Sequence, residues 1–332
     1  MAPIAIPESQ TILLLKGPKQ PYQLVDDYPI PGLNTGSEIL VKTRAIGLNP
    51  IDWKAPDFNF AIPELPYISG RELAGDVCRV LDSSSRLKLG DRVIVISTDY
   101  RDLRKAAYQE FVVSFDYNAV RLPQALSYEE GSTLGVAFVA ASLALGICMG
   151  VDFSDVTNGP DLLKLVKAAD PDSIPEDVRA ETLTGIPEGD RARPGDWIAV
   201  WGGSATSANL IVQLARLAGL KVATIVDSAR HGLRISNHRS IRPDLLIDSH
   251  DPQRAVDVLK ANVGDDLRFG IDTRVGHALV TWLERLLEQG LVSPPEIIDI
   301  EEGLENVNAG LDRMRKGDIR GGKLIVRLDE SR

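Results

Sequence analysis

The stretch "GDWIAVWGGSATSANLIVQLARLAGLKVATIVD", residues 195–227, decides the fold of this chain. It holds an apolar run, a turn of small residues, an amphipathic segment with helical spacing, and a second apolar run that ends at Asp227. This order predicts a buried strand, a turn, a helix and a parallel second strand. The backbone N–H groups at the start of such a helix can bind a pyrophosphate if the residues around them are small.

The turn within this stretch is made of small residues and hydroxyl donors. Its glycine fingerprint is incomplete, because Ala205 and Ala208 stand where two glycines are expected. A turn that contains glycine only for conformational reasons is therefore the alternative interpretation. We predict that the turn binds a dinucleotide through six residues, Gly202, Gly203, Ser204, Ala205, Thr206 and Ser207.

Asp227 and the segment after it bear on which dinucleotide binds. A carboxylate at the end of the second strand accepts the ribose 2′-hydroxyl of NAD. A guanidinium near that ribose suits the 2′-phosphate of NADP instead. A helix cap beside a solvated basic face is the third interpretation, and it involves no ligand. The residues that follow Asp227 and supply these groups are Ser228, Ala229, Arg230, His231 and Arg234.

Length, charge and composition limit the class of protein. The 332 residues are enough for two domains, each with its own core. The net charge of −10 argues against nonspecific affinity for nucleic acid or anionic membranes. We find no apolar run that approaches the roughly 20 residues of a membrane span, and no signal-peptide pattern at the start. We therefore expect a cytoplasmic protein that binds neither nucleic acid nor membrane.

The distribution of histidine and cysteine argues against a zinc site. All four histidines lie at or after residue 231, and the first 150 residues contain only two cysteines, Cys78 and Cys148. A tetrahedral zinc site with nitrogen and sulfur ligands therefore has too few ligands in that region. Because these are the two cysteines of the whole sequence, a disulfide framework is excluded as well. We predict no metal.

The chain divides into four parts by its patterns. Residues 1–150 contain the β-rich runs "SEILVKTRAIGLN", "GDVCRVLD", "DRVIVIS" and "QEFVVSF" and end in an apolar helical segment. Residues 151–194 form a polar insertion with two short helices, which we expect to act as a lid. Residues 195–274 are the nucleotide-binding part, and residues 275–332 return to the first domain.

The nucleotide-binding part is shorter than a full dinucleotide fold. It has room for only four parallel strands, "WIAVWG", "KVATIVD", "LLIDSH" and "RFGIDT", where six are usual. Either the fold is truncated near residue 274, or a segment has been lost from the numbering there. We favour the second explanation.

Several motifs occur in an order that resembles a known superfamily. They are "GLNPIDWK" (47–54), "SGRELAGDVCRV" (69–80), "LKLGDRVIV" (87–95), "YQEFVVSF" (108–115) and the terminal "GGKLIVRL". Together with the nucleotide-binding unit they resemble the zinc-free medium-chain dehydrogenase/reductase superfamily. Within it the chain is most similar to quinone-oxidoreductase-like proteins and to the fungal trans-acting enoyl reductases of polyketide biosynthesis, which include the lovastatin enoyl reductase.

The resemblance implies a fold and a set of site residues. The fold is α/β, with a GroES-like partial β-barrel catalytic domain and a Rossmann domain built on a doubly wound parallel sheet. The cofactor is NADPH, with its 2′-phosphate at Ser228–His231 and a terminal loop over it at Gly321 and Gly322. Further cofactor contacts are expected at Asn49, Ile51, Asp52, Trp53 and Lys54. Substrate contacts are expected at Gly135, Val136, Ala137, Phe138, Val139 and Ala140.

The resemblance also implies a reaction: metal-free, NADPH-dependent reduction of an activated C=C bond, with an enoyl substrate that is small or carrier-bound. Lys54 is the candidate catalytic residue. A polyketide synthase is a possible partner, and a monomer is expected. Departures from the pattern are Arg71, where zinc-dependent members have a histidine, and Phe58 or Phe60, where mitochondrial-type reductases have a tyrosine. An NADPH quinone reductase and a nucleotide-binding pseudo-enzyme that serves as an interaction module are the alternatives.

Overall fold

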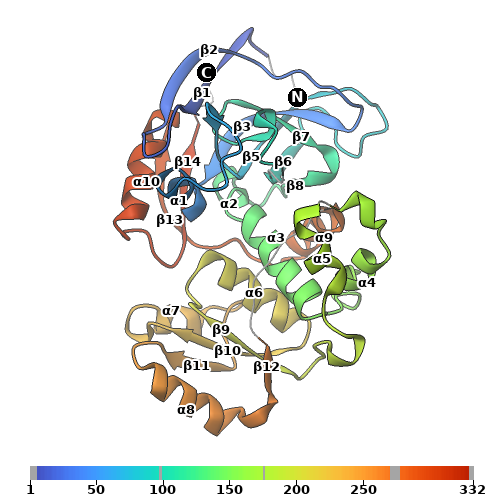
Figure 1. Cartoon of the computed structure of the whole chain (residues 1–332), viewed down its shortest axis with the longest axis vertical. Helices are drawn as coiled ribbons and strands as arrows, with labels where there is room; N and C mark the ends of the chain where they lie inside the picture. The colour runs from blue at the N-terminus through green and yellow to red at the C-terminus, as the bar shows by residue number, and fades with distance from the viewer. Residues whose placement is uncertain (1–5, 97–98, 175, 270–276, 329–332) are drawn as a thin grey trace. The chain divides into compact units, whose positions relative to one another are not determined.

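The computed structural model describes residues 6–96, 99–174, 176–269 and 277–328. The chain forms two compact units, which are coloured along the sequence in Figure 1. Unit 1 consists of Met1–Val136 and Pro294–Arg332, and unit 2 consists of Ala137–Ser293. The chain thus leaves unit 1 once and returns to it. The division of the chain into four parts stays a prediction.

Unit 1 is built on two sheets. The larger has the strand order β13-β14-β3-β5-β6-β8, with β7 also paired to β3, and the smaller has the order β2-β1-β4. Apolar residues of both sheets share one buried core. The strands of the larger sheet are β3 (Glu38–Gly47), β5 (Glu72–Val80), β6 (Arg92–Ile96), β7 (Phe111–Phe115), β8 (Ala119–Arg121), β13 (Ile297–Glu302) and β14 (Lys323–Arg327), and those of the smaller are β1 (Ser9–Leu15), β2 (Gln23–Pro29) and β4 (Tyr67–Ile68).

Among its described residues, unit 1 contains three complete α-helices. They are α1 (Pro50–Phe58), α2 (Tyr128–Gly131) and α10 (Val307–Arg315). Helix α1 begins directly after β3, and a proline occupies its first position, where the missing N–H is not needed. The segment "NPIDWK" is therefore the start of a helix, held at the end of a buried strand.

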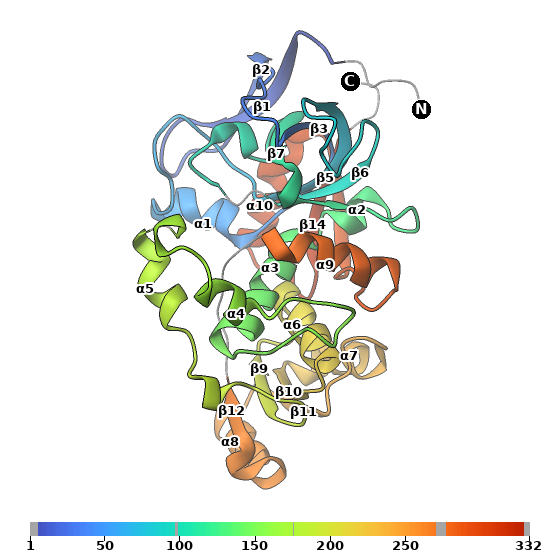
Figure 2. The ribbon, with the colours of Figure 1, turned by 90° about the vertical axis from the view of Figure 1, so that its right-hand side faces the viewer.

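Unit 2 contains a four-stranded sheet in which every described pairing is parallel. Its strand order is β11-β10-β9-β12, so the first strand in sequence lies inside the sheet, as in doubly wound folds. The strands are β9 (Trp197–Trp201), β10 (Lys221–Val226), β11 (Leu245–Asp248) and β12 (Leu267–Phe269), and the helices are α4 (Leu162–Lys167), α5 (Glu176–Thr184), α6 (Thr206–Leu217), α7 (Leu233–Asn237), α8 (Pro252–Asn262) and α9 (His277–Glu288). A further helix, α3 (Gly135–Leu143), starts at the boundary between the units. Figure 2 shows these helices from a second direction.

The predicted α/β fold is confirmed, and all four strands predicted for the parallel sheet are present. The strands β3, β5, β6 and β7 also match β-rich runs of the sequence. The choice between a truncated fold and a lost segment falls on residues 270–276, which lie outside the described residues.

One expectation from composition is wrong. The 21 residues Tyr128–Cys148 are long and apolar enough to cross a membrane by length and composition, with a mean hydropathy of 1.8. However, 78% of that window is buried inside the structure. Core helices of soluble proteins have the same composition, because they too are surrounded by apolar groups. The stretch includes α2, α3 and a turn of π-helix, Ala144–Cys148, rather than one regular helix.

Candidate functional site

A buried ion pair lies at the centre of unit 1. Lys323, the first residue of β14, contacts the carboxylate of Glu72, the first residue of β5. Their side chains are 4% and 0% exposed, respectively. Because a buried charge is costly unless it is paired and hydrogen-bonded, each of these side chains depends on the other.

Asn49 connects this ion pair to the start of α1. Its Oδ1 accepts a hydrogen bond from Lys323 Nζ at 2.8 Å. Its Nδ2 donates to Glu72 Oε1 at 3.0 Å and to the carbonyl oxygen of Gly47 at 3.2 Å. The carboxamide of Asn49 is thus engaged three times within unit 1. It fixes the end of β3 and the first turn of α1 in place.

Glu72 also holds the segment expected to contact substrate. Its Oε2 accepts a hydrogen bond from the backbone N–H of Val136 at 2.8 Å. A Cβ on Gly135 would lie 3.2 Å from the same oxygen, so the chain passes very close to the carboxylate. Lys323 in turn follows directly after Gly321 and Gly322. Three segments that the resemblance places around the cofactor therefore meet at one ion pair.

Asp52, in the first turn of α1, is a buried carboxylate that is only partly satisfied. It is 1% exposed, and its Oδ2 accepts a hydrogen bond from the backbone N–H of Asn49 at 2.8 Å. Its Oδ1 has no hydrogen-bond partner in the described part of the chain. Burial raises the pKa of Asp52 to about 6, although the Asn49 hydrogen bond and the charges of Arg71 and Lys323 oppose the shift. The nearby hydroxyl of Tyr108 is buried and also lacks a hydrogen bond of normal geometry.

Asp52 should make the stability of the protein depend on pH. Its folded-state pKa lies above the ordinary value of 3.8, so the folded state binds the proton more tightly than the unfolded state does. Its contribution is therefore most favourable at low pH and falls by about 3 kcal/mol as the pH rises from about 4 to about 6. We expect Asp52→Asn to remove this fall, as measured by urea unfolding at several pH values. The exposed control Asp155→Asn should keep it. Identical pH profiles for wild type and Asp52→Asn would contradict this assignment.

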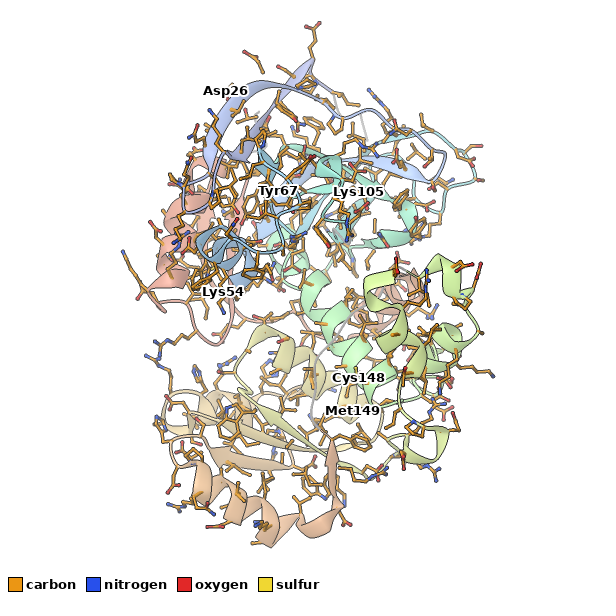
Figure 3. All side chains as sticks on the ribbon, in the orientation of Figure 1. Asp26, Lys54, Tyr67, Lys105, Cys148 and Met149 are labelled. Atoms are coloured by element: carbon orange, nitrogen blue, oxygen red, sulfur yellow. The ribbon has the colours of Figure 1, made fainter. Side chains whose placement is uncertain are left out.

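The remaining residues of the "NPIDWK" segment lie toward the surface of unit 1. Ile51 and Trp53 are half-buried, and Lys54 is exposed on α1, where Figure 3 labels it. The Lys54 ammonium lies 5.6 Å from the centroid of the Trp53 ring. Lys54 makes no ion pair with any described residue. Arg71 stacks its guanidinium over the ring of Tyr100, with 5.4 Å between the guanidinium carbon and the ring centroid.

The predicted substrate residues differ in exposure. Gly135, Ala137 and Phe138 are buried, the last of them completely. Val136, Val139 and Ala140 are half-buried. Their assignment as substrate contacts stays a prediction.

The turn of unit 2 packs tightly against strand β10. Gly202 has a φ of +71°, a conformation that favours glycine. The N–H groups of Gly202 and Gly203 both donate to the carbonyl oxygen of Ile225, at 3.0 and 3.1 Å. A Cβ on Gly203 would lie 2.0 Å from Cγ2 of the buried Thr224. The turn therefore needs glycine at residue 203 for packing, and this requirement holds whether or not a ligand binds.

The helix that follows the turn leaves its start uncapped. Ala205 stands at the cap position of α6, and it has no side chain that could accept a hydrogen bond from the first turn. The first backbone N–H groups of any helix lack partners within the helix. Ser204, Thr206 and Ser207 are half-buried around this end. Small residues, an uncapped helix start and nearby hydroxyl groups fit the pyrophosphate of a dinucleotide.

Asp227 acts as a helix cap in this structure. Its Oδ1 accepts a hydrogen bond from the backbone N–H of Arg230 at 3.0 Å, at the start of the π-helical turn Ser228–Gly232. Ala229 and Arg230 are exposed, whereas His231 is buried. The Arg230 guanidinium has no ion-pair partner among the described residues, so it is available to an anionic ligand. Asp227 therefore caps this turn, and its contact with a cofactor ribose stays a prediction.

A small charged cluster lies beside Asp227. The ligating atoms of Asp227, Asp248 and His250 all lie within 4.8 Å of one another. The side chains are exposed or half-buried. Asp248 accepts hydrogen bonds from the backbone N–H groups of Ser228 and His250, at 3.0 and 3.1 Å. Because these oxygens are already engaged within the protein, we assign no metal to the cluster.

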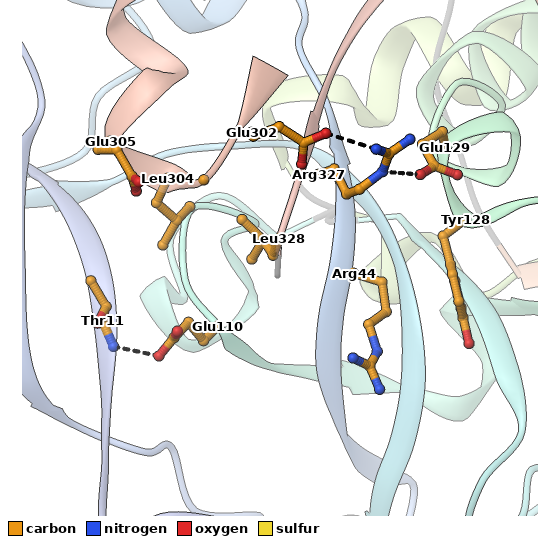
Figure 4. A pocket seen from close by; sticks show the side chains of 11 residues that line it. Thr11, Arg44, Glu110, Tyr128, Glu129, Glu302, Leu304, Glu305, Arg327 and Leu328 are labelled. Carbon is orange, nitrogen blue, oxygen red and sulfur yellow. Dashed lines mark hydrogen bonds and ion pairs between the residues drawn. The ribbon is translucent and has the colours of Figure 1, made fainter. Parts of the chain in front are cut away.

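A surface cavity of about 610 Å³ lies in unit 1, as Figure 4 shows. Arg327 pairs there with both Glu129 and Glu302, and the Thr11 N–H donates to Glu110 Oε2 at 2.8 Å. Ligand sites for organic substrates are mainly apolar, with a few unpaired polar groups. The lining of this cavity is rich in charged groups, and its Arg327 and Arg44 are both engaged in ion pairs within the protein. We therefore assign one candidate region to each unit: the Glu72–Lys323 network in unit 1 and the turn at residues 202–207 in unit 2.

Sequence reasoning missed Lys323, Tyr108 and the burial of Asp52. Glu72 accepts a backbone hydrogen bond from Val136, and its ionic partner is Lys323, which is 251 positions away in the sequence. No local pattern indicates this pairing.

Comparisons with known proteins agree with this architecture. Residues 35–124 match the alcohol dehydrogenase GroES-like domain. The chain is 27% identical over 270 residues to the trans-enoyl reductase caaB of Aspergillus niger, a match that covers 80% of this chain but only 64% of that protein. It is 26% identical to the trans-enoyl reductase resD of Aspergillus sclerotiorum, with 92% of this chain and 96% of that protein covered. The second alignment extends over 372 positions, which exceeds the 332 residues of this chain, so resD carries residues without a counterpart here.

Among solved structures, the quinone oxidoreductase from Coxiella burnetii superposes with a TM-score of 0.65 at 17% identity. The match covers 97% of this chain and 100% of that one, and it shows a common fold. The resemblance to the medium-chain dehydrogenase/reductase superfamily and to the fungal trans-enoyl reductases is thereby confirmed.

Proposed function

We propose that this chain, with its alcohol dehydrogenase GroES-like domain and its trans-enoyl reductase relatives, is an NADPH-dependent reductase of an activated C=C bond. The observation that carries the proposal is the turn of unit 2. Tight glycine packing and an uncapped start of α6 fit a pyrophosphate, and the exposed Arg230 follows at the end of β10. The names of the relatives favour an enoyl group as the acceptor.

Bound NADPH would supply a hydride to the β-carbon of an α,β-unsaturated carbonyl compound. The residues of this chain bind and orient the reactants. Arg230 holds the 2′-phosphate, and the first turn of α6 holds the pyrophosphate. The Glu72–Lys323–Asn49 network fixes the backbone from which Lys54 extends. Lys54 would donate hydrogen bonds to ribose hydroxyl groups of the cofactor and so help to orient it.

The substrate in this proposal is a small or carrier-bound enoyl compound of polyketide biosynthesis, and the setting is the cytoplasm. The net charge of −10 is compatible with a diffusing enzyme that avoids nucleic acid. A polyketide synthase as the source of the substrate is part of the proposal and follows from the resemblance to the fungal trans-acting enoyl reductases. We further propose that the protein is a monomer.

A single experiment tests the proposed activity. Purified protein should oxidise NADPH in the presence of an α,β-unsaturated thioester such as a crotonyl thioester. A simple benzoquinone, added as a separate acceptor, tests the quinone-reductase alternative. Faster turnover of the quinone would favour that alternative. Binding of NADPH without turnover of either acceptor would support a nucleotide-binding interaction module and contradict our proposal.

Arg230 should determine much of the affinity for NADPH. A hydrogen bond to a charged group contributes about 1.5–3 kcal/mol, so Arg230→Ala should weaken NADPH binding by about tenfold or more. NADH lacks the phosphate and should bind the variant almost unchanged. Fluorescence titration of both nucleotides measures the two dissociation constants. Equal losses for NADPH and NADH would show that Asp227, rather than Arg230, makes the discriminating contact.

Lys54 should act through the position of the cofactor. Lys54→Met is expected to weaken NADPH binding by about 1.5–3 kcal/mol, the contribution of one charged donor. If Lys54 instead stabilised charge in the transition state, kcat would fall about 100-fold with little change in NADPH affinity. Lys316→Met, an exposed lysine on unit 1, is the control. Wild-type affinity and turnover in Lys54→Met would remove this residue from the site.

A further inference from the structure

An imidazole lies between two carboxylates at the ends of strands β10 and β11. Nδ1 of His250 is 3.2 Å from each carboxylate oxygen of Asp248, the last residue of β11. Nε2 of the same ring is 3.8 Å from Oδ2 of Asp227, which directly follows β10. Each ring nitrogen therefore faces a different carboxylate. All three residues belong to unit 2.

The two carboxylates are held in place by backbone groups. Asp248 accepts hydrogen bonds from the N–H groups of Ser228 and His250, and Asp227 accepts one from Arg230. These contacts keep the pKa of Asp248 low, at about 2, so its carboxylate stays ionised at any ordinary pH. The imidazole is thus the group of this cluster that titrates near neutral pH.

Asp227 and Asp248 are the acids that shift the pKa of the His250 imidazole, and the other charged groups nearby have the following contacts. Arg230 lies on the π-helical turn that contacts β11, and it forms no ion pair with any acid of the described residues. Asp251 and Arg254 stand at the start of α8, where the Asp251 side chain caps the helix by accepting the Arg254 N–H at 3.0 Å. The hydrogen bond to Asp248 and the charge of Asp227 raise the pKa of His250. The imidazolium is therefore present at lower pH, and it is lost as the pH rises through this raised value.

We propose that His250 selects between the two nicotinamide dinucleotides and that its protonation makes the selection depend on pH. The inference rests on the proposed NADPH site. Asp227 stands where a carboxylate accepts the ribose 2′-hydroxyl of NAD, and the same carboxylate repels a 2′-phosphate. A protonated His250 cancels one of the two negative charges beside the phosphate and leaves Arg230 free to bind it. A neutral His250 restores both negative charges, so the pair of carboxylates favours NADH.

The 2′-phosphate of NADPH titrates as well, and its titration changes the preference for NADPH in the opposite direction. Its second pKa lies near 6, so it gains negative charge as the pH rises and is attracted more strongly to Arg230. This effect is the same in every variant that keeps Arg230. The contribution of His250 is therefore the difference between wild type and a variant with a neutral side chain at this position.

The experiment measures dissociation constants of NADPH and NADH by fluorescence titration between pH 6 and pH 9. For the wild type, relative to His250→Gln, we expect the preference for NADPH to fall by about tenfold across this range, the size of one charge-assisted contact. His250→Gln and His250→Lys should both show only the pH dependence that the phosphate imposes, with the weaker preference for NADPH in His250→Gln and the stronger preference in His250→Lys at each pH. His238→Gln, at a histidine outside the cluster, should behave as the wild type does.

A measurement without nucleotide checks the titration itself. In the NMR spectrum of the free protein, the ring of His250 should titrate above the ordinary pKa of histidine, and Asp248→Asn should lower that value. Parallel pH dependence of the nucleotide preference in wild type and His250→Gln would overturn the inference while leaving the proposed function intact. If neither nucleotide binds at any pH, the proposed function fails, and the inference fails with it.

Discussion

Replacing Lys323 by methionine is expected to lower the free energy of unfolding by about 3–5 kcal/mol, the effect of removing one partner of a buried ion pair. Glu72 would be left as an unpaired carboxylate that is 0% exposed. Asn49 would lose its hydrogen bond from Lys323 at the same time. Because Glu72 also holds the N–H of Val136, the start of α3 should loosen as well. Chemical denaturation of wild type and variant measures the loss.

A double-mutant cycle separates the ion pair from a general loss of packing. Glu72→Gln alone should also destabilise the protein, because it leaves the Lys323 ammonium buried without a counter-charge. In the combined variant Lys323→Met/Glu72→Gln no charge is left unpaired, so the two losses should fall well short of additive. Lys316→Met, on the surface of the same unit, should change the unfolding free energy by no more than about 0.5 kcal/mol. Additive losses in the cycle would mean that the pair contributes no coupling.

Adding one methyl group to the turn of unit 2 should have the second largest effect. In Gly203→Ala the new Cβ would lie 2.0 Å from Cγ2 of Thr224, which is fully buried in β10 and is stiff because it is β-branched. Overpacking of this kind costs about 3 kcal/mol. The turn must shift away from β10, and nucleotide binding should weaken together with stability. Thermal unfolding and NADPH titration measure the two effects.

A second substitution at the point of contact should reverse this loss. Thr224→Ser removes Cγ2 and keeps the hydroxyl, so Gly203→Ala/Thr224→Ser should recover most of the stability and the affinity. Gly202→Ala serves as the matched comparison, because its φ of +71° is unfavourable for alanine while its Cβ would have nothing within 4 Å. Thr224→Ser should not rescue Gly202→Ala. Rescue of both, or of neither, would show that the clash with Thr224 is not the cause.

The comparison of sequence and structure shows where local patterns are sufficient. Strands β9, β10, β11 and β12 were all predicted, since each is a short apolar run bounded by polar or glycine residues. Strands β1, β2, β4, β8 and β13 were not among the predicted runs; of these, β2 has no residue that is fully buried and β4 has only two residues. A strand with little burial has little apolar pattern to detect.

The same limit applies to the site. The turn at residues 202–207 and the position of Asp227 follow from the order of strand, turn, helix and strand, which is local information. The contact between Asp227 and His250 depends on the pairing of β10 with β11. The raised pKa of Asp52 depends on burial, which its neighbours in sequence do not reveal.

By itself the sequence determined the elements of the parallel sheet, the nucleotide turn and the family resemblance, because these depend on residue types at short spacing. Only the tertiary structure decided that Glu72 pairs with Lys323 across 251 positions and that Asn49 and Val136 join them. The register of β14 and β5 on either side of β3 brings these side chains together. A buried charged side chain then pairs with the opposite charge that the register places beside it, because leaving it unpaired costs several kcal/mol.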